Sequence, residues 1–211
     1  MKITLPDKSL RELPEGSSGY DLAKDIGPGL AKSAVAVTIN GIQKDLHDVI
    51  EGDVSASIIT IDSDEGIEIM RHTLTAQVLA RAVKNIYPNS KLAIGPTIED
   101  GFYYDVETEE AISIDDLKKI EDEMIKIVKT KSSITKKLVS KEEALKIFKS
   151  QKETYKENII NESEQISDFQ LYYQDDKKFV DLCRGPHLPN LSFVGAFKLT
   201  KVSGAYWKGD S

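Results

Sequence analysis

The amino-terminal part of the chain alternates apolar and polar residues over short stretches, a pattern typical of half-buried β-strands. Strands are predicted at 2–5, 9–13, 35–39 and 57–61. Asn40-Gly41 predicts a hairpin turn. Ser18 and Asp21 form a capping box that predicts a helix over 20–26, followed directly by a turn. Strands packed around one helix predict a ubiquitin-like β-grasp fold for residues 1–62.

The pattern becomes helical after the polar stretch IDSDEG (61–66), which we interpret as a domain boundary. Apolar residues three to four positions apart predict helices over 68–87, 113–129 and 142–149. The first of these should stop at Pro88, and the polar segment 152–160 is compatible with a further helix. Strands are predicted at 92–94, 102–106, 170–173, 178–182, 193–199 and 204–207. Helices packed on a mostly antiparallel sheet predict an α+β domain over 63–211.

Composition excludes several classes of protein. No apolar run is long enough to span a membrane, and the first residues lack the apolar segment of a signal peptide. A single cysteine excludes an internal disulfide, so we expect a cytoplasmic location. The formal net charge of −7 argues against nonspecific binding to nucleic acid, although it is compatible with a local site for one RNA end.

The stretch FVDLCRGPH (179–187) contains most of the candidate chemistry, because it holds the only cysteine, Cys183, and one of three histidines, His187. Its proline disfavours a helix, so a strand that ends in a tight turn would present the thiol, the imidazole and the Arg184 guanidinium together. Asp181 would orient a base or accept a hydrogen bond. The alternative is a solvated turn with a buried, inert cysteine, and residue types alone leave both interpretations open.

Three long motifs follow one another along the second part of the chain. They are IGPTIEDGFYYDV (94–106), FVDLCRGPHLPN (179–190) and GAYWKGDS (204–211). Together with ITLPD and DIGPGLAK in the first part, they resemble the N-terminal region of bacterial-type threonyl-tRNA synthetases. The resemblance covers essentially the whole chain and implies a TGS domain over 1–62. It also implies an editing domain over 63–211, which alanyl-tRNA synthetases share more distantly.

The resemblance implies hydrolysis of serine that has been wrongly esterified to the 3′ end of tRNA(Thr). Serine lacks one methyl group of threonine, and a methyl group supplies only about 1–3 kcal/mol of discrimination. A second pocket that admits serine and excludes threonine is therefore needed. Ester hydrolysis requires a positioned water, a group that takes its proton, and donors for the developing oxyanion.

The family also implies roles for individual residues. Cys183 and His187 would lie at the scissile ester, and Lys156 would contact the oxyanion or the ribose. Asp181 would bind the seryl amine or hold the site, and Tyr104 would contact the terminal adenosine by stacking. Arg184, from the same motif, is a further candidate for contact with the tRNA.

The chain departs from the family in its first predicted helix, where the family has Arg-His-x-x-x-His with both histidines on one helical face. Aligning the downstream half of the helix places Thr73 and Gln77 at the histidine positions. Aligning the Arg-His pair instead makes His72 the first histidine and Ala76 the second. The registers differ by one residue, an apparent insertion near Thr73. His72 and Gln77 share a face only if the helix is irregular there.

Two functional interpretations follow from this departure. In the first, His72 reaches the site and Gln77 orients water, with His72, His187 or the ribose hydroxyl of the substrate as the base. In the second, editing is lost and the region only assists tRNA binding. A free-standing trans-editing protein is a third interpretation, which the TGS domain disfavours. Related alanyl editing domains hold zinc with His-x-x-x-His and Cys-x-x-x-His, but this chain should lack the extra histidines, so no metal is predicted.

The family continues beyond the last motif into its aminoacylation core. We therefore expect this chain to be an N-terminal fragment of a threonine-tRNA ligase that cannot itself make threonyl-tRNA. The zinc and ATP sites of the family, and the contacts of its homodimer, are expected in that core, so no cofactor is predicted for the fragment.

Overall fold

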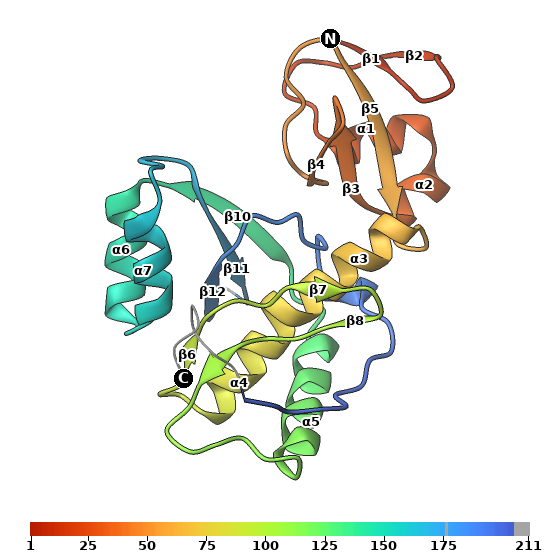
Figure 1. Ribbon diagram of the computed structural model, residues 1–211. Coiled ribbons are helices and arrows are strands. Elements are labelled where there is room, and N and C mark those ends of the chain that lie inside the picture. Colours follow the sequence, from red (N-terminus) through yellow and green to blue (C-terminus); the bar gives the residue numbers. More distant parts are fainter. Residues whose placement is uncertain (176, 205–211) are drawn as a thin grey trace.

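The computed structural model describes residues 1–175 and 177–204 (Figure 1). Residues up to Thr60 form a five-stranded mixed sheet in the order β2-β1-β5-β3-β4, with β1 and β5 parallel. Two short helices, α1 and α2, lie between β2 and β3. The elements of this first module are β1 (Lys2–Thr4), β2 (Leu10–Glu12), α1 (Gly19–Ile26), α2 (Pro28–Ser33), β3 (Ala34–Ile39), β4 (Ile42–Asp45) and β5 (Val54–Thr60).

Local sequence signals account for most of this module. The Ser18 side chain accepts from the backbone N–H of Asp21, and the Asp21 carboxylate accepts from the Ser18 N–H, which confirms the predicted capping box. Asn40 and Gly41 both have positive φ and close the hairpin of β3 and β4, as predicted. The predicted turn after the first helix is wrong, because Pro28 starts α2, where its fixed φ suits the first helical turn.

One long helical rod connects the two parts of the molecule. It consists of α3 (Asp64–Thr73), the π-helical segment η1 (Leu74–Leu79) and α4 (Ala80–Ile86). The helix starts earlier than predicted, because the Ser63 side chain accepts from the Gly66 N–H and caps it. A Cβ on Gly66 would lie 1.9 Å from the Thr60 carbonyl oxygen, so the end of β5 packs directly on the first turn of α3. The polar stretch interpreted as a boundary is therefore a tight junction.

The remaining elements surround the rod (Figure 1). A three-stranded antiparallel sheet in the order β10-β11-β12 carries α6 and α7 at one side, while α5 packs against η1 and α4. Two small hairpins pair β6 with β9 and β7 with β8. The elements are β6 (Lys91–Leu92), β7 (Thr97–Ile98), β8 (Gly101–Phe102), β9 (Val106–Glu107), α5 (Asp116–Lys129), β10 (Ile134–Val139), α6 (Lys141–Ser150), α7 (Thr154–Glu162), β11 (Phe169–Gln174), β12 (Phe179–Leu182) and the 3₁₀ helix η2 (Leu191–Phe193).

These elements confirm the α+β class, with a ubiquitin-like first module and a mostly antiparallel second sheet. The predicted strand at 193–199 is wrong: apart from the end of η2, the segment has no regular secondary structure, and at its end the Leu199 N–H and the Lys198 ammonium bond to Glu121 on α5. Strand β10 was missed by the sequence analysis. The strand predicted at 204–207 lies almost entirely outside the described residues. No helix of the described ranges is long and apolar enough to cross a membrane.

Candidate active site

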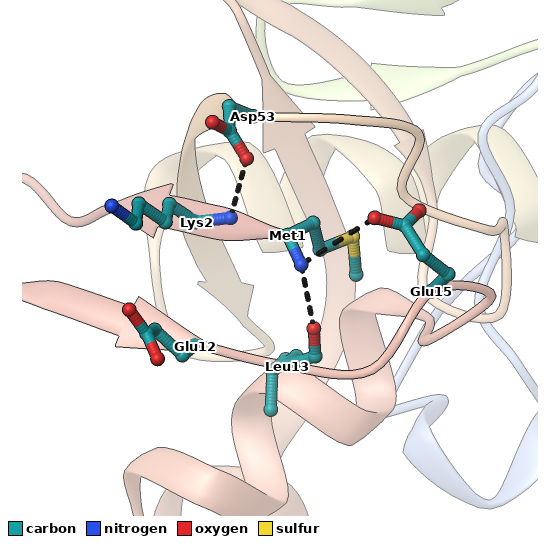
Figure 2. Close-up of a pocket in the computed structure, with 6 residues that line it drawn as sticks. All are labelled: Met1, Lys2, Glu12, Leu13, Glu15 and Asp53. Atoms are coloured by element: carbon teal, nitrogen blue, oxygen red, sulfur yellow. Dashed lines mark hydrogen bonds and ion pairs between the residues drawn. The ribbon is translucent and has the colours of Figure 1, made fainter.

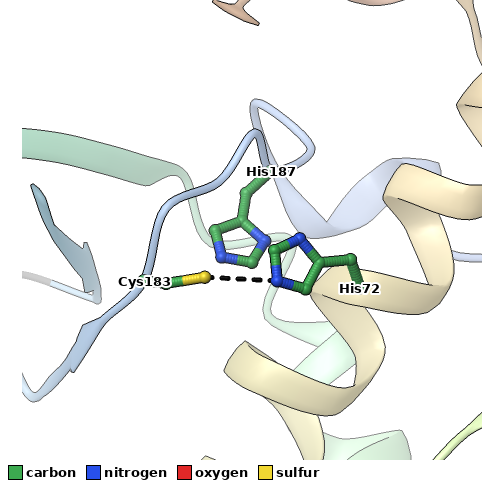
Figure 3. A group of neighbouring side chains, drawn as sticks. All are labelled: His72, Cys183 and His187. Carbon is green, nitrogen blue, oxygen red and sulfur yellow. Dashed lines mark hydrogen bonds between the residues drawn. The ribbon is translucent and has the colours of Figure 1, made fainter. Parts of the chain in front are cut away.

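Three side chains that the sequence analysis singled out lie next to one another (Figure 3). His72 comes from the last turn of α3, and Cys183 and His187 come from the loop that follows β12. The Cys183 Sγ lies 3.2 Å from the His72 Nε2, and the two imidazole rings stack with centroids 4.5 Å apart. The structure therefore brings His72 into contact with the motif that contains Cys183, although the two segments are far apart in sequence.

The loop that carries Cys183 and His187 has a shape that requires glycine. Gly185 has a φ of +65°, in the left-handed region that glycine favours, and a Cβ there would lie 1.9 Å from the Tyr172 hydroxyl. The Tyr172 ring also meets the His187 ring edge-on, with centroids 4.6 Å apart. Tyr172 on β11 is therefore the wall against which the loop folds.

Hydrogen bonds define which nitrogen of His72 carries the proton. The Nδ1 lies 3.3 Å from the Pro186 carbonyl oxygen, which can only accept, so Nδ1 is the donor. Burial lowers the pKa of His72, which favours the neutral imidazole. In that form the Nε2 is an acceptor, and the Cys183 thiol donates to it. The arrangement is a thiol and a base, with a carbonyl that orients the base.

In His187, hydrogen bonds favour the proton on the other ring nitrogen. The Thr73 hydroxyl accepts from the Leu188 N–H at 3.0 Å and lies 3.1 Å from the His187 Nδ1. When the hydroxyl donates to Nδ1, the ring proton is on Nε2. This nitrogen is buried and has no hydrogen-bond partner among the described residues. His187 therefore offers an unpaired N–H donor next to the acceptor nitrogen of His72.

Lys156 and Asp181 form a buried ion pair in the same region. The Lys156 ammonium on α7 lies 2.8 Å from Asp181 Oδ1 on β12, and the two residues are only 3% and 2% exposed. Burial is the largest single influence and opposes the charge on Lys156, but Asp181 and Tyr104 together outweigh it and raise the pKa of the ammonium. Lys156 also donates to the Tyr104 hydroxyl at 3.1 Å. Lys156 and Asp181, predicted with separate roles, are thus paired with each other, and the Tyr104 O–H keeps its own proton to donate.

Tyr104 was predicted as a stacking partner for the terminal adenosine. The structure places its partly buried ring beside Gly95, where a Cβ would approach the ring to 2.2 Å, and in a small apolar cluster with Ala80 and Phe179. Burial raises the pKa of Tyr104, which keeps the hydroxyl protonated. The ring is packed against protein, and the hydroxyl is its chemically available part. Arg184, in contrast, is exposed and makes no ion pair within the described residues.

The sequence ambiguity in the first helix corresponds to a structural feature. Between α3 and α4 the Ala80 N–H donates to the Thr75 carbonyl, five residues earlier, which is the π-helical pattern. A π segment accommodates one residue more than a regular α-helix, so the upstream and downstream registers differ by one, as the two alignments do. The irregularity that His72 and Gln77 would need is present.

Gln77 makes its hydrogen bonds away from the three-residue cluster. The Gln174 Nε2 donates to the Gln77 Oε1 at 2.8 Å and to the Gln77 carbonyl at 3.0 Å. Arg81 extends this chain, since its guanidinium donates to the Gln174 Oε1 and pairs with Asp175 at 2.9 Å. The buried Gln77 Nε2 has no partner among the described residues. The Gln77 amide nitrogen can therefore still donate a hydrogen bond, whereas its amide oxygen is already bonded to Gln174.

Among the described residues, one cluster could hold a metal. The prediction that the chain cannot supply a three-ligand site is wrong, because ligand atoms of His72, Cys183 and His187 lie within 4.8 Å of one another. One thiol and two imidazoles are a donor set that zinc can use.

The sequence analysis missed one residue that contacts the site from the first module. Asp45, at the end of β4, accepts a hydrogen bond from the His187 backbone N–H at 2.9 Å and from the Tyr172 hydroxyl at 2.7 Å. No local signal distinguishes this aspartate from others in the chain. The hollow near the amino terminus is a separate feature of the module: it is lined by polar groups such as Glu15 and Asp53, and none of the candidate residues lies there (Figure 2).

Comparison with protein families gives two matches. Residues 1–60 match the TGS domain, and residues 170–211 match the threonyl and alanyl tRNA synthetase second additional domain. The second match contains Asp181, Cys183 and His187, whereas His72 and Lys156 precede it. Taken together and in this order, the two domains fit the N-terminal region of a threonyl-tRNA synthetase.

Proposed function

We propose that this chain hydrolyses the ester of seryl-tRNA(Thr), with the cluster of His72, Cys183 and His187 at the scissile bond. The observation that carries the proposal is the 3.2 Å contact between the Cys183 thiol and the His72 acceptor nitrogen. A base is therefore present although the second histidine of the family pattern is replaced by Gln77. The match to an editing-domain family that acts on tRNA supports the same substrate class.

The proposed reaction starts with a water beside Cys183. The water gives a proton to Sγ while the thiol passes its own proton to the His72 Nε2, and the water oxygen attacks the ester carbon. The unpaired Nε2–H of His187 stabilises the oxyanion that forms. The carbon–oxygen bond to the ribose then breaks, and the ribose oxygen takes the proton from His72.

The buried polar group next to the cluster would bind the rest of the substrate. Asp181 balances Lys156 and would attract the α-ammonium group of serine. Because Lys156 donates to the Tyr104 oxygen, the Tyr104 O–H proton is free to donate to the ribose or the seryl hydroxyl. Exposed Arg184 would contact a phosphate of the tRNA 3′ end.

Deacylation of seryl-tRNA(Thr) and threonyl-tRNA(Thr) tests the proposal. We expect serine-selective hydrolysis by the chain and loss of it in the Cys183→Ala, His187→Ala double variant. His47→Ala is a matched control, since His47 is exposed and its ring lies beside the Tyr20 ring within the TGS module, with centroids 5.4 Å apart. Hydrolysis no faster than in buffer would contradict the proposal. It would favour an editing-deficient region that only assists tRNA binding, which a filter-binding assay with tRNA(Thr) would then measure.

A further inference from the structure

We propose that the TGS module is part of the editing site, and that Asp45 is the positioning residue through which it holds the loop of Cys183 and His187. The inference extends the proposed function, because it assigns to the first module a role in the geometry of the reaction centre. Asp45 does not touch the cluster side chains in this proposal. It acts through the backbone of His187 and through Tyr172.

The two carboxylate oxygens of Asp45 have separate partners in the second part of the chain. Oδ1 accepts from the His187 N–H at 2.9 Å, and Oδ2 accepts from the Tyr172 O–H at 2.7 Å. The Lys136 ammonium on β10 lies 3.0 Å from the same Oδ2 and 2.6 Å from Asp48. One side chain of β4 therefore contacts β10, β11 and the loop after β12. Three donors on one carboxylate form a charge-assisted network with a defined geometry.

Tyr172 transmits this contact to the cluster. Its ring is 2% exposed and meets His187 edge-on, and its hydroxyl occupies the space where a Gly185 side chain would be. Burial and the neighbouring Asp45 raise the pKa of Tyr172, so the hydroxyl stays protonated and remains a donor. With the hydroxyl bonded to Asp45, the ring has one orientation. The position of His187 relative to His72 then depends on a carboxylate from the TGS module.

Neighbouring charges make Asp45 hard to replace within the network. The other acidic group is Asp48, which already accepts from Lys136 and also accepts from the Asp45 N–H. Without Asp45, the His187 N–H and the Tyr172 O–H would both lose an acceptor in a partly or fully buried setting. The loop would have to move to find another partner, and the cluster would move with it.

The test compares Asp45→Ala and Asp45→Asn in the full chain. Asp25→Asn is the matched control, because Asp25 pairs with Arg11 inside the TGS module at 3.4 Å and its side chain is 38% exposed. We expect Asp45→Ala to lower kcat for seryl-tRNA(Thr) by roughly tenfold to a hundredfold, with little change in KM. Asp45→Asn should recover part of the rate, since its amide oxygen can still accept from His187. Asp25→Asn should match the unaltered chain.

A second readout does not depend on activity. Cys183 is the only cysteine, so the rate of its alkylation by iodoacetamide reports on the thiol and its bond to His72. The pH profile of this rate should shift in Asp45→Ala, and the His187 amide resonance should move in both Asp45 variants. A change in Tm alone, with alkylation and the His187 resonance as in the Asp25→Asn control, would show that Asp45 only joins the modules and would overturn the inference.

The two proposals fail in different ways. If the unaltered chain does not hydrolyse seryl-tRNA(Thr), the proposed function fails, while the alkylation profile and the amide resonance still decide the role of Asp45. If the chain is active and Asp45→Ala keeps its full kcat, the inference fails and the proposed function stands. Should Asp45→Ala not fold, Asp45→Asn carries the same comparison, because it keeps the size of the side chain.

Discussion

The polar groups upstream and downstream of the π segment differ in which hydrogen-bonding atoms remain available to a substrate. Upstream, His72 keeps an acceptor nitrogen bonded only to a thiol, and the neighbouring His187 keeps an unpaired donor. Downstream, Gln174 takes the Gln77 amide oxygen, and Arg81 takes the Gln174 oxygen. The first group can accept and release a proton, whereas the second fixes the rod to β11. The base in this chain therefore has to come from the group around His72, upstream of the π segment.

The largest expected effect is on the upstream side. His72→Ala removes the group that takes the proton, and we expect kcat for seryl-tRNA(Thr) to fall by about 10²–10⁴-fold. His72→Gln should not restore the rate, because an amide cannot act as a base. Single-turnover deacylation, with His47→Ala alongside, measures the effect. A His72→Ala variant with near-normal kcat would place the base elsewhere and remove the contrast between the two groups.

A smaller effect is expected from Thr73→Val, which keeps the shape of the side chain and removes its hydroxyl. The change leaves the buried Leu188 N–H without its acceptor and frees the His187 Nδ1. The expected costs are about 1–3 kcal/mol of unfolding free energy and a measurable loss of kcat. Nitrogen-15 NMR of the histidine rings should show a mixture of His187 tautomers in Thr73→Val. Thr73→Ser should retain the Nε2–H form of His187. If the His187 ring in Thr73→Val gives the same nitrogen-15 spectrum as in the unaltered chain, the assigned tautomer is contradicted.

Downstream, the expected effect is on stability with little effect on rate. Gln77→Leu removes the oxygen that accepts from Gln174 but leaves the backbone carbonyl that accepts from the same nitrogen. We expect a loss of about 1 kcal/mol in the free energy of unfolding, measured with urea. Seryl-tRNA(Thr) hydrolysis should change little. A loss of rate as large as that of His72→Ala would show that Gln77 belongs to the reacting group after all.

The smallest expected effect is the dependence of stability and hydrolysis on pH. Burial lowers the pKa of His72 from 6.5, so the unfolded chain takes up this proton first as the pH falls. The contribution of His72 to stability is therefore complete above pH 6.5 and decreases as the pH falls below that value. The rate of hydrolysis should likewise be constant above pH 6.5 and decline as the pH falls below that value. The urea midpoints of the unaltered chain and of His72→Ala are measured above and below pH 6.5. The difference between them at each pH isolates the contribution of His72 to stability.

Much of the fold was predictable because its signals are local. The Ser18 capping box and the Asn40-Gly41 turn involve neighbouring residues, and both are present as predicted. The unpaired segment before residue 199 was mispredicted as a strand because its alternation reflects contact with α5. Whether an extended segment pairs with a strand or lies along a helix depends on residues far away in sequence.

The site was predictable to a different degree. The sequence identified the loop of Cys183 and His187, and its two competing registers indicated a one-residue insertion near Thr73, which left open whether the helix is irregular there. The contact of His72 with Cys183 depends on how the rod crosses the sheet, which no local pattern gives. Asp45 was missed for the same reason, since its partners follow it by 142 and 127 residues and are reached only through folding.

The single surplus residue of the π segment has a consequence for how this site can change. In a regular helix each residue adds about 100° of rotation. A π segment turns less per residue, so the six residues 74–79 wind about as far as five would in a regular helix. Deleting one residue there would restore regular winding while α3 keeps its orientation relative to α4, so His72 would still face Cys183. The π segment thus lets the rod gain or lose one residue without exchanging the side chain that faces the thiol.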